Sequence, residues 1–247
     1  MIKKPQNEYL DEPVVSVTSI SKAFGSRIVL KDINFELDRG RGLLICGING
    51  AGKSTLLNII SGLMSSDKGT TKLCGIDIHS EPQKGKTQLG VISHKSILYP
   101  ELTIFENLLF FANLYDVENA RNRVDELIEN MGLSAYRYDK TRVLSRGMLQ
   151  RLAISRAIVH QPAVLLIDEP FTGLDAEACE HLINILDEFR DDGGTLVATS
   201  HDIKLGLKCC DRIAVLDKNR FILEAKTNEI NTELFVENYL EYARSRN

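Results

Sequence analysis

The sequence predicts an α/β fold: a mostly parallel sheet with helices packed on it, a β-rich N-terminal edge and a helical insertion. Short apolar runs typical of buried strands alternate with apolar residues at helical spacing, both before residue 99 and after residue 163. Between these two stretches the helical spacing continues without a strand pattern. A glycine-rich stretch at residues 47–54 separates a predicted strand from a predicted helix, which is where parallel sheets bind ligands.

The N-terminal part of the chain is predicted to be rich in strands. Residues 13–20 and 28–37 alternate apolar and polar side chains, which is typical of strands with one exposed face. A helix is predicted to begin within residues 52–54 and to end at Gly62, because glycine commonly terminates helices. The other predicted strands are shorter and lie at residues 43–46, 71–74 and 89–93.

The middle of the chain is predicted to be helical. Apolar residues recur at helical spacing over residues 103–115 and 118–131, and a third helix over residues 144–160 leads back to the sheet. We therefore expect a helical subdomain over about residues 100–155. The surrounding core is expected to comprise about residues 13–99 and 156–220.

The C-terminal part returns to alternating strands and helices. All 247 residues are expected to form a single domain, because this length suits one large α/β domain with an insertion. The predicted elements are strands at residues 163–167, 195–199 and 212–216, helices at residues 177–190 and 203–209, and a last helix at residues 232–243.

Composition and charge argue against two classes of protein. Lys and Arg number 30 against 34 Asp and Glu, without a basic stripe, so we expect no nucleic-acid partner. The longest aliphatic run, residues 163–167, is far shorter than the roughly 18 residues of a membrane-spanning helix. The five scattered cysteines fit a reducing cytosol. We expect a cytoplasmic protein that is peripheral on the inner face of the cell membrane, held there by a partner.

Residues 47–54 match the phosphate-binding motif G-x-x-x-x-G-K-[ST] at every fixed position. Glycines allow backbone N–H groups to surround phosphates, and the N-terminus of the following helix adds partial positive charge. Lys53 is expected to neutralise the β- and γ-phosphates, and the Ser54 hydroxyl to ligate Mg²⁺. The expected nucleotide-binding residues of this stretch are Gly47, Ile48, Asn49, Gly50, Ala51, Gly52, Lys53, Ser54 and Thr55.

Two acidic residues follow the apolar strand predicted at residues 163–167. A carboxylate at the tip of a buried strand is costly unless a cation is nearby, so Asp168 is the expected partner of Mg²⁺. Glu169 comes next and is placed to polarise a water for attack on the γ-phosphate. Together with the phosphate motif, these acids predict an enzyme that hydrolyses a nucleotide with Mg²⁺ as its cofactor.

A further segment connects these elements to a known family. Residues 144–148, Leu-Ser-Arg-Gly-Met, lie about twenty residues before Asp168 at the head of a helix. They resemble the LSGGQ signature of ABC-transporter ATPases, and the other motifs of that family follow in order over roughly residues 13–220. The resemblance implies a P-loop NTPase fold with an ABC-type helical subdomain. It also implies an ATP-hydrolysing subunit that works with integral membrane permease subunits.

The same resemblance assigns roles to five residues outside the phosphate motif. It implies that Phe24 stacks on adenine, that Asp175 lies in the D-loop, and that the catalytic residue His201 senses the γ-phosphate. It further implies that Ser145 and Gly147 contact ATP held by a second ATP-binding subunit. A single chain would then need a head-to-tail homodimer to complete each site.

Three residues depart from the family pattern. Arg146 stands where the signature has its first glycine, and Met148 where it has glutamine, so the fine geometry of this segment stays open. His94 stands at the place of a glutamine that couples Mg²⁺ and the attacking water to the membrane subunit. A neutral histidine can offer a nitrogen to water or metal, which makes His94 a candidate catalytic residue. The alternative is a surface histidine, with the role of glutamine lost.

The sequence of residues 93–111 is similar to the corresponding segment of the haem-exporter ATP-binding subunit of cytochrome c maturation. Exporter ATPases for drugs, lipids or polysaccharides share much of it and remain an alternative. A soluble ABC ATPase, such as one that serves iron–sulfur cluster assembly, is a second alternative. Translation or DNA-repair ABC proteins carry two cassettes or long coiled coils, which this sequence lacks, and a P-loop kinase would leave the signature segment unexplained.

Overall fold

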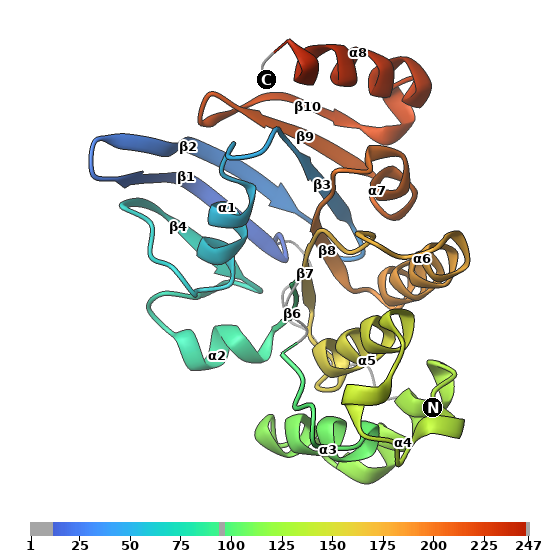
Figure 1. Ribbon diagram of the computed structural model, residues 1–247. Coiled ribbons are helices and arrows are strands. Elements are labelled where there is room, and N and C mark those ends of the chain that lie inside the picture. The colour runs from blue at the N-terminus through green and yellow to red at the C-terminus, as the bar shows by residue number, and fades with distance from the viewer. Residues whose placement is uncertain (1–11, 94–96, 246–247) are drawn as a thin grey trace.

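The computed structural model describes residues 12–93 and 97–245, which form two sheets flanked by helices (Figure 1). The central sheet has six strands in the order β10-β9-β3-β8-β7-β6, and all neighbours are parallel except the antiparallel pair β9 and β10. Crossovers between its parallel strands place their carboxyl ends at one edge. The strands are β3 Gly42–Cys46, β6 Leu89–Ile92, β7 Val164–Asp168, β8 Thr195–Thr199, β9 Arg212–Asp217 and β10 Arg220–Lys226.

The second sheet is antiparallel, with four strands in the order β2-β1-β4-β5. It shares a core with one face of the central sheet and with helix α1, Lys53–Ile60, so that buried side chains of all three pack together. The β-rich N-terminal edge predicted from the alternating sequence therefore exists, and it backs the segment that precedes α1. The strands are β1 Val15–Phe24, β2 Arg27–Leu37, β4 Lys68–Leu73 and β5 Ile76–Asp77.

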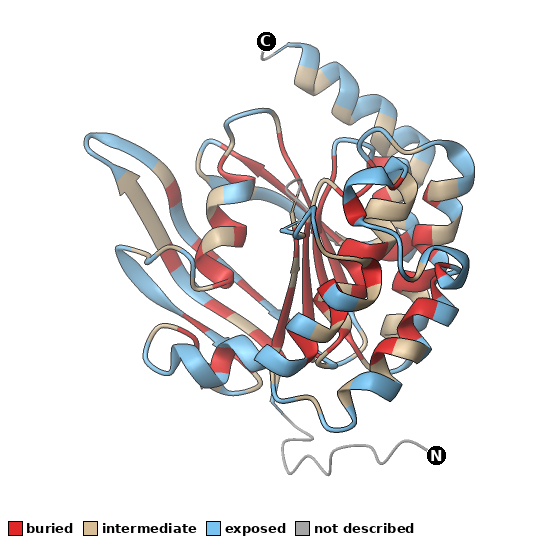
Figure 2. Cartoon of the chain, turned by 60° about the horizontal axis from the view of Figure 1, so that its bottom comes forward, coloured by how far each residue is buried: buried red, intermediate tan, exposed pale blue. Residues whose placement is uncertain are grey.

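Helices cover the other face of the central sheet. In Figure 2 the central strands are buried throughout most of their length, whereas these helices expose their outer faces. Their inner faces join the sheet in a second core, in which the apolar side chains of α5 and α6 meet those of β7 and β8. The helices on this side are α5 Arg146–Ile158, α6 Ala176–Asp191, α7 Ile203–Cys209 and α8 Thr232–Arg244.

The described residues between β6 and β7 contain helices and no strand. Helix α3 begins with a capping box in which Thr103 and Glu106 satisfy each other's backbone N–H groups. The elements are α3 Ile104–Leu114, α4 Ala120–Asn130, the short 3₁₀ turns Ser134–Tyr136 and Thr141–Val143, and α5. The predicted helices are thus present, while the division of the chain at residues 100 and 155 stays a prediction.

The structure also contains elements that were not predicted from the sequence: the two-residue strand β5, the 3₁₀ turns, helix α2 and strand β10. Strand β10 pairs with β9 along one side only, and most of its side chains face solvent. Helix α2, Pro82–Thr87, is six residues long with only Gly85 buried, so it has no apolar stripe to detect. A short 3₁₀ turn, Thr227–Glu229, leads into the last helix. None of the described helices is long and apolar enough to cross a membrane.

Candidate active site

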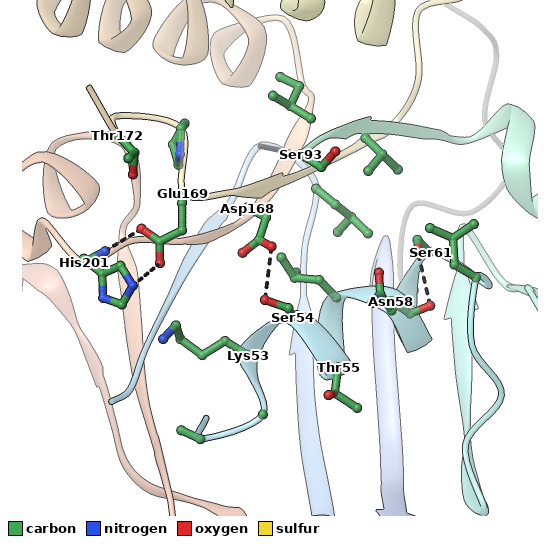
Figure 3. A pocket seen from close by; sticks show the side chains of 18 of the residues that line it. Lys53, Ser54, Thr55, Asn58, Ser61, Ser93, Asp168, Glu169, Thr172 and His201 are labelled. Carbon is green, nitrogen blue, oxygen red and sulfur yellow. Dashed lines mark hydrogen bonds and ion pairs between the residues drawn. The ribbon is translucent and has the colours of Figure 1, made fainter. Parts of the chain in front are cut away.

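A cavity of about 1160 Å³ opens at the carboxyl ends of β3 and β7. It brings together side chains from both sheets and from six segments of the chain, and Figure 3 shows its inner part. Most of the residues predicted for one ATP molecule line it or lie directly behind its wall. They are Phe24, the stretch from Asn49 to Thr55, Asp168, Glu169 and His201.

The loop between β3 and α1 packs so closely that two of its glycines are required. A Cβ on Gly47 would lie 2.6 Å from the carbonyl oxygen of Leu216 in β9, which a rigid backbone cannot accept. Gly52 has φ +110° and an added Cβ would lie 3.1 Å from the carbonyl oxygen of Val29 in β2. Both neighbouring strands therefore hold the loop against the N-terminus of α1, where backbone N–H groups attract anions.

Lys53 is folded into this loop and is only 7% exposed. Its Nζ donates to the carbonyl oxygens of Gly47 at 2.7 Å and Ile48 at 3.4 Å. Burial lowers the pKa of Lys53, and the nearby carboxylate of Glu169 partly opposes this effect. Because the two carbonyl partners carry no net charge, an anion entering the loop would find an ammonium that is only partly compensated.

Asp168 is the last residue of β7, and both of its carboxylate oxygens are bonded. Oδ2 accepts from the Ser54 hydroxyl at 3.1 Å, and Oδ1 accepts from the hydroxyl of Thr199 at 2.6 Å (Figure 3 shows the first bond). Mg²⁺ prefers oxygen ligands such as those of carboxylates and hydroxyls. The pair of Ser54 and Asp168 therefore fits the metal expected from the sequence.

Thr199 was missed by the sequence prediction. It ends β8 directly opposite Asp168 in the register of β7 and β8. Besides bonding that carboxylate, it receives the backbone N–H of Glu169 at 3.2 Å on its carbonyl and its hydroxyl oxygens. In the sequence, only its position at the end of a predicted strand pointed to the site. The register with β7 is needed to show that it faces Asp168.

Both the backbone and the carboxylate of Glu169 are fixed by their surroundings. Its φ of +55° lies in the left-handed region, which a residue with a side chain adopts only when its surroundings fix it. Its Oε2 accepts the backbone N–H of His201 at 2.8 Å, and its Oε1 lies 3.3 Å from Nε2 of the same histidine (Figure 3). The structure thus brings Glu169 and His201 together at the edge of the phosphate loop.

Phe24 lies at the mouth of the cavity, at the end of β1. Its ring is 50% exposed, and Nζ of Lys22 lies 5.7 Å from the ring centroid. An exposed aromatic ring at a cavity rim can stack on a planar base, which is the role expected for it.

Three predicted site residues line a different cavity. Ser145, Gly147 and Asp175 lie around a space of about 630 Å³ between the N-termini of α5 and α6. Ser145 and Asp175 cap these helices by accepting the backbone N–H groups of Met148 and Ala178 at 3.3 and 2.8 Å. The chain does not bring this group to its own Lys53. His94, the remaining predicted residue, lies outside the described residues.

Comparison with known proteins gives a consistent family. A family model described as "ABC transporter" matches residues 30–172. The chain is 35% identical over 211 residues to a linearmycin resistance ATP-binding protein of Bacillus subtilis, covering 85% of this chain and 68% of that protein. It is 33% identical over 222 residues to a Nod factor export ATP-binding protein of Ralstonia nicotianae, with 89% and 69% covered. A spermidine/putrescine import ATP-binding protein of Pasteurella multocida is 34% identical over 236 residues, with 93% and 64% covered.

Solved structures agree with these relatives. An ATP-binding subunit of an ABC transporter superposes with a TM-score of 0.84 at 28% identity, covering 92% of this chain and 98% of that one. The cbiO1 protein of Clostridium perfringens, part of the ABC transporter complex cbiONQ, gives 0.81 at 25% identity, with 93% of each chain covered. A dimeric, post-hydrolysis structure of the ATP-binding cassette MJ0796 with ADP and Pi gives 0.77 at 28% identity, with 86% and 98% covered. The predicted α/β fold of P-loop ATPases is confirmed.

Proposed function

The chain belongs to the ABC transporter family as an ATP-binding ATPase subunit, and we propose that it powers transport by closing a head-to-tail dimer over two ATP molecules. One observation carries this proposal. The residues expected around a single ATP are divided between two cavities of the same chain, one around Lys53 and one around Ser145 and Gly147.

The two cavities are complementary in chemistry. The first offers a buried ammonium, a helix N-terminus and a metal-binding pair, which suit the triphosphate. The second offers the N-terminus of the thirteen-residue helix α5, which begins after Ser145 with no acidic residue in its first turn. A second chain turned head to tail would set its α5 N-terminus against the exposed side of the first chain's ATP.

Within each site, the chain's own residues divide the work. Lys53 would compensate phosphate charge, Ser54 and Asp168 would hold Mg²⁺, and Phe24 would stack on the base. When bound, Mg²⁺ supplies neutralisation of charge on the phosphate oxygens. Glu169 acts as the base that polarises the attacking water, and His201 keeps its carboxylate oriented through the contacts at 2.8 and 3.3 Å.

The mechanical output is proposed to reach membrane permease subunits on the inner face of the cell membrane. The proposed contact surface lies at residues 97–109 and continues along α3. Four large apolar side chains there are 42–63% exposed, which is typical of a surface that a partner covers. They are Ile97, Tyr99, Phe110 and Leu114. His94 would lie at the start of this surface in the sequence.

Closure of the dimer is tested with Glu169→Gln, which removes the base and keeps the ATP contacts. We expect this variant to bind Mg²⁺-ATP, to turn over almost none of it, and to double its mass in light scattering. Ser145→Arg in the same background should stay monomeric, since the larger side chain fills the second cavity. Ser134→Arg, an exposed serine in the same helical stretch, is the matched control and should still dimerise.

The result that overturns the shared site combines two observations. Glu169→Gln would remain monomeric at saturating Mg²⁺-ATP, and Ser145→Arg alone would leave ATPase activity intact. Loss of ATP binding in Glu169→Gln would instead mean that the base is misassigned. Copurification with soluble assembly proteins, and not with a membrane protein, would favour the alternative of a soluble ABC ATPase.

For the cargo, we propose export, with haem for cytochrome c maturation as the specific candidate. The wording of residues 93–111 supports it, whereas the relatives named above serve linearmycin resistance, Nod factor export and polyamine import. Deletion of the gene should abolish covalently bound haem in c-type cytochromes. If these cytochromes persist and the cells instead lose resistance to an amphipathic drug, the haem candidate is wrong and an exporter of organic compounds takes its place.

A further inference from the structure

Arg146 is the first residue of α5 and lies between the two cavities, lining both. Its Nη2 donates to the carbonyl oxygen of Thr172 at 2.6 Å. A charged donor makes this bond stronger than one between neutral groups. The side chain therefore ties the N-terminus of α5 to the segment that follows Glu169.

The guanidinium also lies directly on Gly173. This glycine has φ +71°, and a Cβ added there would overlap three atoms of the Arg146 guanidinium. The backbone conformation favours glycine here, and any side chain at this position would have to displace the guanidinium. The arginine and the glycine form one fitted contact.

Gln150 makes a second link from the same face of α5. It is one helical turn beyond Arg146, and its Nε2 donates to the carbonyl oxygen of Pro170 at 3.3 Å. The two α5 side chains therefore bond alternate carbonyls of residues 170–172. This segment joins Glu169 to Asp175, the cap of α6.

We propose that Arg146 is a positioning residue for hydrolysis: it anchors residues 170–173 so that the carboxylate of Glu169 keeps its working orientation. The inference rests on the proposed role of Glu169 as base. The left-handed backbone of Glu169 must be fixed from both directions. Thr199 fixes it on the side of β7, and Arg146 with Gln150 fixes the chain on the other side.

The rival role for a cation at this position is direct binding of ATP phosphate. The two roles differ in which kinetic constant they move. A positioning residue changes kcat at nearly constant KM, while a phosphate contact formed in the ground state raises KM. They also differ in tolerance for lysine, which keeps the charge without the planar fork that lies on Gly173.

The test compares Arg146→Met, Arg146→Lys and the control Arg142→Met in steady-state ATPase assays on the intact chain. Arg142 is an exposed arginine ahead of α5 whose Nε lies 3.7 Å from Glu101. We expect Arg146→Met to lower kcat about tenfold, the usual effect of one charge-assisted hydrogen bond, with KM for ATP within about twofold of wild type. The control should keep the wild-type kcat. A raised KM in Arg146→Met that Arg146→Lys restores would overturn the proposal.

Gly173→Ala offers a second way to break the same link. Its new Cβ would displace the guanidinium from Thr172, and the φ of +71° would also strain the backbone, so the decisive comparison is with the double variant. We expect Gly173→Ala to lower kcat, and the double variant with Arg146→Met to be no slower than the slower single variant. Effects that multiply would show that the two residues act separately, and would contradict the proposal.

This result is separable from failure of the dimer mechanism. Arg146→Met combined with Glu169→Gln should still dimerise with Mg²⁺-ATP, because Ser145 and Gly147 are unchanged. If Glu169→Gln alone fails to dimerise, the proposed function fails. If it dimerises while Arg146→Met keeps the wild-type kcat, only the inference about Arg146 fails.

Discussion

Replacing the buried lysine of the phosphate loop should make the nucleotide-free chain more stable. Lys53→Met removes the charge of a residue that is 7% exposed and whose pKa is lowered by burial. The lowered pKa means that burial of the ammonium outweighs its attraction to the nearby carboxylates of Glu169 and Asp168. Methionine removes this cost, and for a chain of this size each 1 kcal/mol removed would raise Tm by about 2–4 °C.

ATP should reverse the order of the two proteins. Saturation of the wild type at about 100 times Kd adds about 2.7 kcal/mol, or roughly 5–11 °C, whereas Lys53→Met loses the charge that receives the triphosphate. Differential scanning fluorimetry with and without Mg²⁺-ATP measures both effects. A lower Tm for nucleotide-free Lys53→Met would refute the reasoning, because the lysine would then be structural.

The pH dependence of this difference has a defined sign. The folded-state pKa of Lys53 lies below its ordinary value of 10.5, so the unfolded chain binds more protons between the two values. Wild-type stability relative to Lys53→Met therefore rises with pH in that window. The advantage of the variant should be complete at neutral pH and should shrink as the pH approaches 10.5. A difference that grows with pH would contradict the assignment of burial as the cause.

Four further variants test the loop, the signature, the last helix and a buried histidine. Gly47→Ala should cost about 1–3 kcal/mol in thermal unfolding, since its Cβ would lie 2.6 Å from a carbonyl oxygen of β9; an unchanged Tm would mean that the loop can shift. The new Cβ in Gly147→Ala would meet its nearest neighbour, a methyl of α6, at 3.8 Å, so the variant should keep its free energy of unfolding or raise it by up to about 1 kcal/mol while losing ATPase activity. Full activity would argue against contact with a partner's ATP. Tyr242→Phe loses the 2.5 Å hydrogen bond from its hydroxyl to the buried Asp217 carboxylate and should lower the free energy of unfolding in urea by about 1.5–3 kcal/mol. An unchanged value would mean that this contact of α8 does not stabilise the chain. Burial lowers the pKa of His160 from 6.5 to about 4, so the unfolded chain binds more protons than the folded chain between these pH values, and the wild type loses stability as the pH falls through them. His160→Phe keeps the ring stacking on the tyrosine after α3 and should lose less stability over this range. Equal slopes of unfolding free energy against pH for the two proteins would contradict this.

The sequence predicts those parts of the site whose geometry is set by residues adjacent along the chain. Gly47, Gly52, Lys53 and Ser54 belong to one turn whose geometry follows from local backbone needs and from a helix N-terminus. The spacing of these residues in the sequence is therefore enough to predict the loop that they form. Asp168 is similar, because an acid after a buried apolar run is costly unless something nearby compensates it.

The parts that the sequence does not predict depend on contacts between distant segments. Thr199 is 31 residues from Asp168, and their hydrogen bond follows from the register in which β8 pairs with β7. Strand β10 escaped prediction for a related reason. Its side chains are mostly exposed, so only pairing with β9 defines it. Long-range pairing leaves no local pattern in either case.

Arg146 shows how a departure from a motif can be accommodated by a residue far away in the sequence. From the signature segment alone, an arginine in place of glycine leaves the geometry open. In the structure the added side chain does not fill the second cavity, because Gly173 leaves room for the guanidinium and the Thr172 carbonyl accepts from it. Glu169 is then approached from two directions: β8 holds its backbone through Thr199, and α5 holds the segment after it. Helix α5 belongs to the helical stretch whose neighbour α3 carries the proposed permease surface. A displacement of that stretch would therefore reach the carboxylate of Glu169, the proposed base, through Arg146 and Gln150, without passing through the bound nucleotide.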